Sequence, residues 1–206
     1  MLLPDLQSRV RIALTTTIVN EWSLLSQEGG TSRPSERAVA FHLGWYLRPM
    51  VEDSWNIDCE YNRSGMHLEE SVRLVDDDGR RIPDLIVHHR GKLGPEHNLL
   101  LLELATDRAD VEGAATGDFG RARALQARFG YQYAAVLDLR IGGDAAERPV
   151  APHWQWAELD VGPVDAGSVY EDDVLTEILG RAVEGRRRVG DYPATANPSA
   201  LAVPYR

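Results

Sequence analysis

The chain has 206 residues, 43% of them hydrophobic and 26% charged, so it is long enough to bury a core, and one domain is the simplest count. Its formal net charge of −10 argues against a general nucleic-acid coat protein, because nonspecific affinity comes mainly from Lys and Arg that neutralise phosphates. No stretch approaches the roughly 20 apolar residues of a membrane span, and a single cysteine, Cys59, excludes an internal disulfide framework and a multi-cysteine zinc site.

The first expected element is an amphipathic helix over residues 6–27, because its apolar side chains recur close to every 3.6 residues. The chain start before it has neither the basic residues nor the apolar stretch of a signal peptide, so we expect a cytoplasmic protein without a membrane partner. A second helix is expected to open within Ser32-Arg33-Pro34-Ser35-Glu36, with serine as the cap candidate, Pro34 near the first turn and Glu36 near the start, and to run to Pro49. Its apolar positions are Ala38, Phe41, Leu43, Trp45 and Leu47.

Residues 55–62 alternate between apolar and polar side chains, which predicts a strand with Ile57, Cys59 and Tyr61 on its apolar face. This pattern favours Cys59 as a core residue over a nucleophile. The following Asp76-Asp77-Asp78-Gly79 is interpreted as an Asp-Gly turn. A calcium loop would need a glutamate at its twelfth position, where this chain has Val87.

Two further strands, over residues 81–88 and 98–105, are expected to form an antiparallel hairpin. Asp84 enters the first strand and Glu103 leaves the second, so pairing places both carboxylates at the same end of the sheet. The run from Leu99 to Leu102 has no polar face, which indicates a central strand covered on both sides. Two adjacent carboxylates are compatible with a divalent-metal site.

The rest of the chain is expected to form a flexible entry over residues 113–120, then a helix that ends at Gly130, and a strand over 131–139. Beyond Gly143 we expect a strand over 154–159 and a helix over 169–185. The triplet Arg186-Arg187-Arg188 is interpreted as the basic end of that helix in preference to a phosphate contact. A single domain over 1–190 and an irregular, proline-containing tail over 191–206 complete the prediction.

Pro83-Asp84 on one strand and Glu103-Leu104 on the next resemble the signature of the PD-(D/E)XK nuclease superfamily, in which Pro-Asp is followed by Glu-x-Lys on the next strand. The order of the surrounding elements is similar over residues 33–140. The resemblance implies an α/β fold of the restriction-endonuclease type, a mixed sheet flanked by helices with an α-β-β-β-α-β core. The resemblance bears on the fold first, and on the activity only by analogy with the family.

The same resemblance implies a set of site residues. Asp84 and Glu103 would bind Mg²⁺ or Mn²⁺ directly, and the backbone carbonyl of Leu104 would be a third oxygen ligand. Glu36 would orient a water or a second metal ion. Such oxygen ligands suit Mg²⁺, which would activate water for phosphodiester hydrolysis. The alternative is that Asp84 merely starts a strand and that Glu103 ends one in an ion pair with an arginine.

This sequence departs from the motif at Ala105, which stands where the family has its lysine. Lys92 is the only lysine, and it lies at the hairpin turn, roughly 25 Å along the strand from Asp84 at about 3.3 Å per residue. Arg121 and Arg123, on the helix after the motif, are therefore the candidate cations. Arginine holds phosphate bidentately but is no base at neutral pH. His88 lies about 13 Å along from Asp84 by the same spacing, too far to share its metal ion.

Two hypotheses follow. In the first, the chain is a Mg²⁺-dependent nuclease that acts on nucleic acid through Asp84 and Glu103, assisted by Glu36. In the second, it is a degenerate member of that fold, which binds a protein or nucleic acid, or another copy of itself, without cutting. Ala105 is the feature that divides them, because the motif lysine stabilises charge on the transferring phosphate.

Overall fold

The computed structural model describes residues 1–21, 35–61, 82–106, 111–139 and 152–165; within 111–116 it describes the backbone only. Several predictions lie outside the described residues. They are the end of the first helix at 22–27, the turn at 76–79, the helix at 169–185, the triplet Arg186-Arg187-Arg188 and the tail at 191–206.

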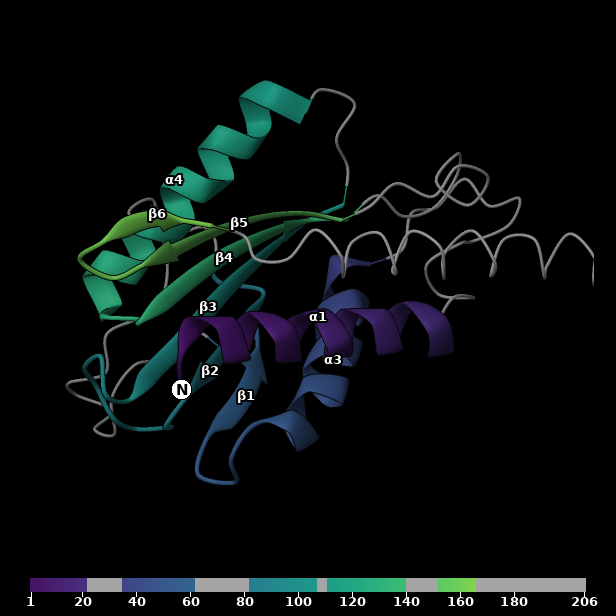
Figure 1. Ribbon diagram of the computed structural model, residues 1–206, viewed down its shortest axis with the longest axis horizontal. Coiled ribbons are helices and arrows are strands. Elements are labelled where there is room, and N and C mark those ends of the chain that lie inside the picture. Colours follow the sequence, from purple (N-terminus) through teal and green to yellow (C-terminus); the bar gives the residue numbers. More distant parts are fainter. Residues whose placement is uncertain (22–34, 62–81, 107–110, 140–151, 166–206) are drawn as a thin grey trace, which may run out of the picture.

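A six-stranded sheet forms the centre of the molecule, and its strands lie side by side in chain order (Figure 1). The strands are β1 (Asn56–Cys59), β2 (Leu85–His88), β3 (Asn98–Ala105), β4 (Tyr133–Asp138), β5 (His153–Glu158) and β6 (Gly162–Val164). β3 and β4 pair in parallel, and the other neighbouring strands pair antiparallel. The sheet is therefore mixed, as expected, and mostly antiparallel.

Helices cover both faces of this sheet (Figure 1). α1 (Leu3–Asn20) and α3 (Glu36–Leu47) pack on one face, followed by the short 3₁₀ helix η1 (Arg48–Met50), and α4 (Val111–Phe129) packs on the other. Each face has its own apolar cluster, and alternate residues of β2 and β3 contribute to each cluster. In the described part of the chain, no helix combines the length and apolar character needed to span a bilayer.

The hairpin prediction is confirmed. β2 and β3 pair antiparallel with Leu85 opposite Leu102, and every residue of β3 is buried, as a central strand requires. The predicted order of helix, three strands, helix and strand is present as α3, β1, β2, β3, α4 and β4. The predicted end of α4 is also confirmed, since Gly130 has a φ of 69°, the left-handed conformation that glycine adopts most easily.

The predicted flexible entry to α4 is wrong, because the helix already begins at Val111. The glycines between residues 113 and 120 are the reason that the sequence predicts a flexible segment, because glycine lowers helix stability by about 1 kcal/mol relative to alanine. A β-carbon added at Gly117 or Gly120 would meet nothing within 4 Å, so both positions lie on the open side of the helix. Packing of its other side, through Leu125 and Phe129, offsets their cost.

Two of the apolar positions of α3 are exposed. Phe41 and Trp45 are 54% and 66% accessible, whereas the buried stripe consists of Val39, Ala40, Leu43, Gly44 and Leu47. The predicted apolar set contained spacings of two residues, which place side chains on nearly opposite sides of a helix. Phe41 and Trp45 instead stack on each other outside the core, with ring centroids 6.2 Å apart.

The strand β1 ends earlier than predicted, and this changes the position of Tyr61. Ile57 and Cys59 pack against the cluster under α1 and α3, as expected, but Tyr61 packs against the cluster under α4. Glu60 has a φ of 48°, which breaks the extended alternation after Cys59. Tyr61 consequently lies on the opposite face.

Candidate active site

The two acids of the motif lie at the same end of the sheet. Because Leu85 pairs with Leu102, continuing the antiparallel register places Asp84 beside Glu103. Both residues alternate in phase with Ile86 and Leu101, which belong to the cluster under α4, so both side chains face α4. The Leu104 backbone amide donates a hydrogen bond to Asp84 Oδ2 at 2.7 Å, which fixes that carboxylate against β3.

Arg121 extends from α4 to this pair. Its Nη2 donates to Glu103 Oε2 at 3.2 Å, and its Nη1 donates to Asp118 Oδ1 at 2.8 Å. The Arg121 side chain is 20% exposed and that of Glu103 only 5%, so this ion pair is largely shielded from solvent. Ala105, two residues after Glu103 on the same strand, has no charge to offer. The helix therefore supplies a permanent positive charge to the acid pair.

Burial is the main influence on the titration of both acids. It raises the pKa of Glu103 to about 7, with the charge of Asp84 adding to the rise and Arg121 opposing it. Burial also raises the pKa of Asp84 to about 6; the Leu104 hydrogen bond opposes this, and the charges of Glu36 and Glu60 add to it. Carboxyl groups with shifted pKa values around a cation are typical of functional sites, although structural ion-pair networks also shift pKa values.

Glu36, the first residue of α3, lies at the edge of the same site. Its Oε1 accepts hydrogen bonds from the Thr106 hydroxyl at 2.8 Å and from the Thr106 amide at 3.3 Å. These bonds tie α3 to the residue that follows β3. Together with the effect of its charge on Asp84, they bring Glu36 to the carboxylate pair from the other helix layer.

Arg123 is placed elsewhere. It is exposed, and its Nη2 lies 3.6 Å from where a β-carbon on Gly162 would sit, at the turn between β5 and β6. Gly162 pairs with Glu158, which pairs with Tyr133 at the start of β4, whereas Glu103 pairs with Val136 further along that strand. The structure thus brings Arg121 to the acids and directs Arg123 away from them.

Gln126, one turn further along α4, is a structural residue. Its Nε2 donates to the backbone carbonyls of Gln132 and Ala157, each at 3.2 Å, and the residue is 3% exposed. These bonds join α4 to the strands beneath it. Gln126 therefore ties α4 to β5 and to the start of β4.

The donor set fits a hard divalent cation. Among the described residues, no group of three or more His, Cys, Asp or Glu side chains is arranged to hold a metal ion, so the pair of Asp84 and Glu103 is the ligand set to be tested. Mg²⁺ is commonly bound by one or two carboxylates with water and substrate phosphate completing its shell. Glu103 Oε1 is buried without a hydrogen-bond partner in the described part of the chain, a cost that a bound cation would relieve. Participation of the Leu104 carbonyl stays a prediction.

Sequence reasoning missed two members of this site, Asp118 and Thr106. Asp118 precedes Arg121 by three residues, a spacing at which helical side chains meet, so the pair was detectable once a helix was assumed there. Thr106 gave no such signal, because its partner Glu36 lies 70 residues away in the sequence.

Histidine chemistry is absent from this end of the described sheet. His88 is buried at the other end of β2, with its Nε2 2.9 Å from Asp58 Oδ2, and Arg90 donates to both oxygens of that carboxylate. Burial alone would raise the pKa of Asp58, but the hydrogen bonds from Arg90 and His88 hold it at about 2. His88 is thus a buried, hydrogen-bonded residue of the sheet.

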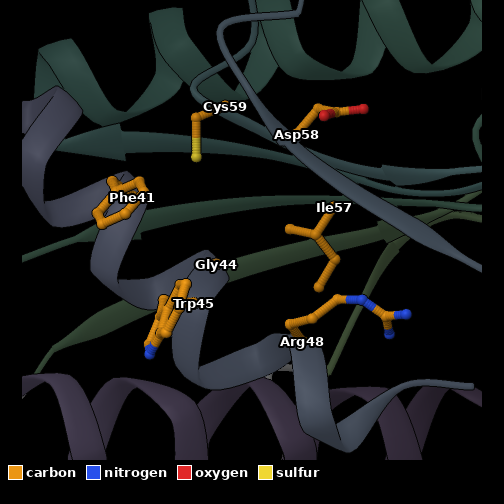
Figure 2. Close-up of a pocket in the computed structure, with 7 residues that line it drawn as sticks. All are labelled: Phe41, Gly44, Trp45, Arg48, Ile57, Asp58 and Cys59. Carbon is orange, nitrogen blue, oxygen red and sulfur yellow. The ribbon is translucent and has the colours of Figure 1, made fainter. Parts of the chain in front are cut away.

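A separate recess of about 380 Å³ lies between α3 and β1 (Figure 2). Gly44 lets α3 approach β1 closely, because a β-carbon at this position would lie 3.2 Å from Ile57 Cγ2. Ile57 and Cys59 project toward the helix, and the exposed rings of Phe41 and Trp45 stand beside the recess. Burial raises the pKa of the Cys59 thiol to about 11, so the thiol stays protonated, which agrees with its interpretation as a non-nucleophilic residue. This recess is on the α3 side of the sheet, away from the face to which Asp84 and Glu103 point.

Comparisons of the chain with protein-family models, with curated proteins and with solved structures gave no significant match. The functional assignment is therefore based on the geometry of the site and on the resemblance of its motif.

Proposed function

We propose that this chain is a Mg²⁺- or Mn²⁺-dependent nuclease of the PD-(D/E)XK type, which hydrolyses phosphodiester bonds of nucleic acid at the end of β3. The observation that carries the proposal is the convergence of two acids with raised pKa values, Asp84 and Glu103, on one cation, Arg121. The order of α3, β1, β2, β3, α4 and β4 supports a restriction-endonuclease-like fold. The acid pair and the order of elements are independent features of that resemblance.

Each residue has a defined task in this proposal. A bound metal ion would polarise the phosphate and lower the pKa of the attacking water. Asp84 and Glu103 hold the ion through ionised carboxylates, because a nearby cation reverses the effect of burial on their pKa values. Arg121, released from Glu103, binds the phosphate with its planar guanidinium. Glu36 accepts a hydrogen bond from a water at the mouth of the site.

A second candidate function is a degenerate site that binds nucleic acid or protein and does not cut. The observation that favours it is the contact of Arg121 with both Glu103 and Asp118, which already neutralises charge in the site. Ala105 cannot supply the missing amine. In such a protein the acids, the arginine and the fold persist without turnover.

A cleavage assay separates the two candidates. The full chain, incubated with single- and double-stranded DNA and RNA in Mn²⁺, is expected to cleave at least one of them, and Glu103→Gln is expected to lower the rate by roughly 100-fold or more, because it removes a metal-binding charge. Glu96→Gln, a change in an exposed acid of the hairpin turn, is the matched control and should cleave normally. Wild-type protein that cleaves none of the substrates would favour the degenerate binder. Cleavage that survives Glu103→Gln would reject the proposed site.

A further inference from the structure

A second group of potential ligands lies at the opposite end of the hairpin, where the β2–β3 connection begins and ends. His89 follows β2 and His97 precedes β3, and the His89 amide donates to the His97 carbonyl at 2.8 Å. Their imidazole rings meet across this pair, with the two Nδ1 atoms 3.1 Å apart and the ring planes inclined by 69°. The proposed nuclease chemistry uses neither ring.

The backbone holds these two histidines in a fixed relation. The connection between them is closed by hydrogen bonds from the Lys92 amide to the His89 carbonyl and from the His97 amide to the Gly94 carbonyl. The Gln132 side chain binds the Pro95 carbonyl at 2.6 Å, which attaches the loop to the start of β4. A pair of ligands held in this way binds an ion without first losing conformational entropy.

The surroundings also restrain the two rings. Trp55 stacks on His89 with centroids 3.9 Å apart and planes inclined by 12°. Glu96 Oε1 lies 3.7 Å from His97 Nε2, the nitrogen of this ring that does not face His89.

The distance between the two nitrogens suits a shared ion. Two imidazole nitrogens bound at about 2.0–2.1 Å to one tetrahedral zinc ion lie roughly 3.3 Å apart, close to the 3.1 Å observed here. Neutral imidazole is a favoured ligand of Zn²⁺, Ni²⁺ and Cu²⁺, whereas Mg²⁺ and Mn²⁺ prefer oxygen. The histidine pair and the acid pair therefore select different classes of metal ion.

We propose that His89 and His97 form a two-histidine site for a divalent transition-metal ion of the Zn²⁺, Ni²⁺ and Cu²⁺ class. The two Nδ1 atoms share one proton in a hydrogen bond, and the ion would replace this proton, which moves to Nε2 of the same ring or to water. Within the described residues no third His, Cys, Asp or Glu side chain joins this pair as a metal ligand, and water would complete the coordination shell. The site lies at the far end of β2 and β3 from Asp84 and Glu103. It is independent of the proposed nuclease function.

The first test is a calorimetric titration of the untagged full chain with ZnCl₂, in parallel with a titration by CuCl₂ followed through tryptophan fluorescence. We expect one ion per chain and quenching by Cu²⁺ that is reduced in Trp55→Phe, because Trp55 stacks on a ligand ring. His89→Asn and His97→Asn should each weaken binding by at least about tenfold, as loss of one arm of a chelate does. His153→Asn, in an exposed histidine of β5, should bind as the wild type does.

A second measurement needs no substitution in the site. Long-range ¹H–¹⁵N spectra of the wild-type imidazoles should show two of the six histidine rings shifting together on addition of Zn²⁺, both at Nδ1. Absence of binding, or binding that neither His89→Asn nor His97→Asn weakens, would show that the pair is only hydrogen-bonded. Zn²⁺ shifts confined to other histidines would overturn the proposal equally.

Discussion

Arg121→Ala is expected to reduce nucleic-acid cleavage by roughly 100-fold, whereas Arg123→Ala leaves cleavage close to the wild-type rate. Of these two arginines, Arg121 contacts Glu103 and Arg123 lies at the start of β6, and removing one charge-stabilising donor from a hydrolytic site typically costs about 10²–10³ in rate. The measurement is the single-turnover cleavage rate of the two variants in Mn²⁺ on the substrate that the wild type cuts best.

The two arginines are a matched pair, since both lie on α4 and the two variants remove the same side chain. Stabilisation of the protein by metal should persist in Arg121→Ala, because the carboxylates remain and lose their internal counter-ion. Equal rates for the two variants would remove Arg121 from the proposed mechanism. A large loss in Arg123→Ala would place the phosphate at the β5–β6 turn instead.

Glu103→Gln is expected to stabilise the fold at pH 8 in the absence of metal, and to have a much smaller effect at pH 5. A carboxyl group with a raised folded-state pKa contributes stability that is fully present below its unfolded value, near 4.5, and is lost as the pH rises through about 7. The ionised form is thus the destabilising one. The shift from 4.5 to about 7 corresponds to at most about 3 kcal/mol at 1.36 kcal/mol per pKa unit.

The measurement is urea denaturation of wild type and variant at pH 5 and pH 8 with EDTA present. The difference in unfolding free energy between variant and wild type at pH 5 is the internal control. It measures the effect of changing the Arg121 hydrogen bond when the charge of Glu103 contributes little. Asp84→Asn should behave similarly over a slightly lower pH range, since its pKa is raised to about 6. A difference between variant and wild type that does not change with pH would contradict the electrostatic description of the site.

The parts of the fold that sequence predicted correctly have strong local signals. The run from Leu99 to Leu102 has no polar face, which predicts a central strand buried on both sides. The register of the antiparallel hairpin then places Asp84 beside Glu103. Gly130 ends α4 through its own backbone preference. None of these features depends on a distant partner.

The parts that failed depend on tertiary contacts or on the rotational phase of a helix. Tyr61 changed faces because of the left-handed backbone at Glu60, which the sequence does not indicate. Arg121 and Arg123 are about 200° apart around a helix, so both could not face the site. The buried stripe of Ala122, Leu125 and Phe129 distinguishes them once the start of α4 is known.

The central claim is that Asp84 and Glu103 together bind a divalent cation, and calorimetric titration of MnCl₂ into the full chain at pH 8 tests it most directly. This pH is above both raised pKa values, so protons do not compete with the metal. We predict that the wild type and His89→Asn bind Mn²⁺ alike, whereas Asp84→Asn combined with Glu103→Gln abolishes the binding. Undetectable Mn²⁺ binding by the wild type, or equal binding by the double variant, would contradict the assignment of this site.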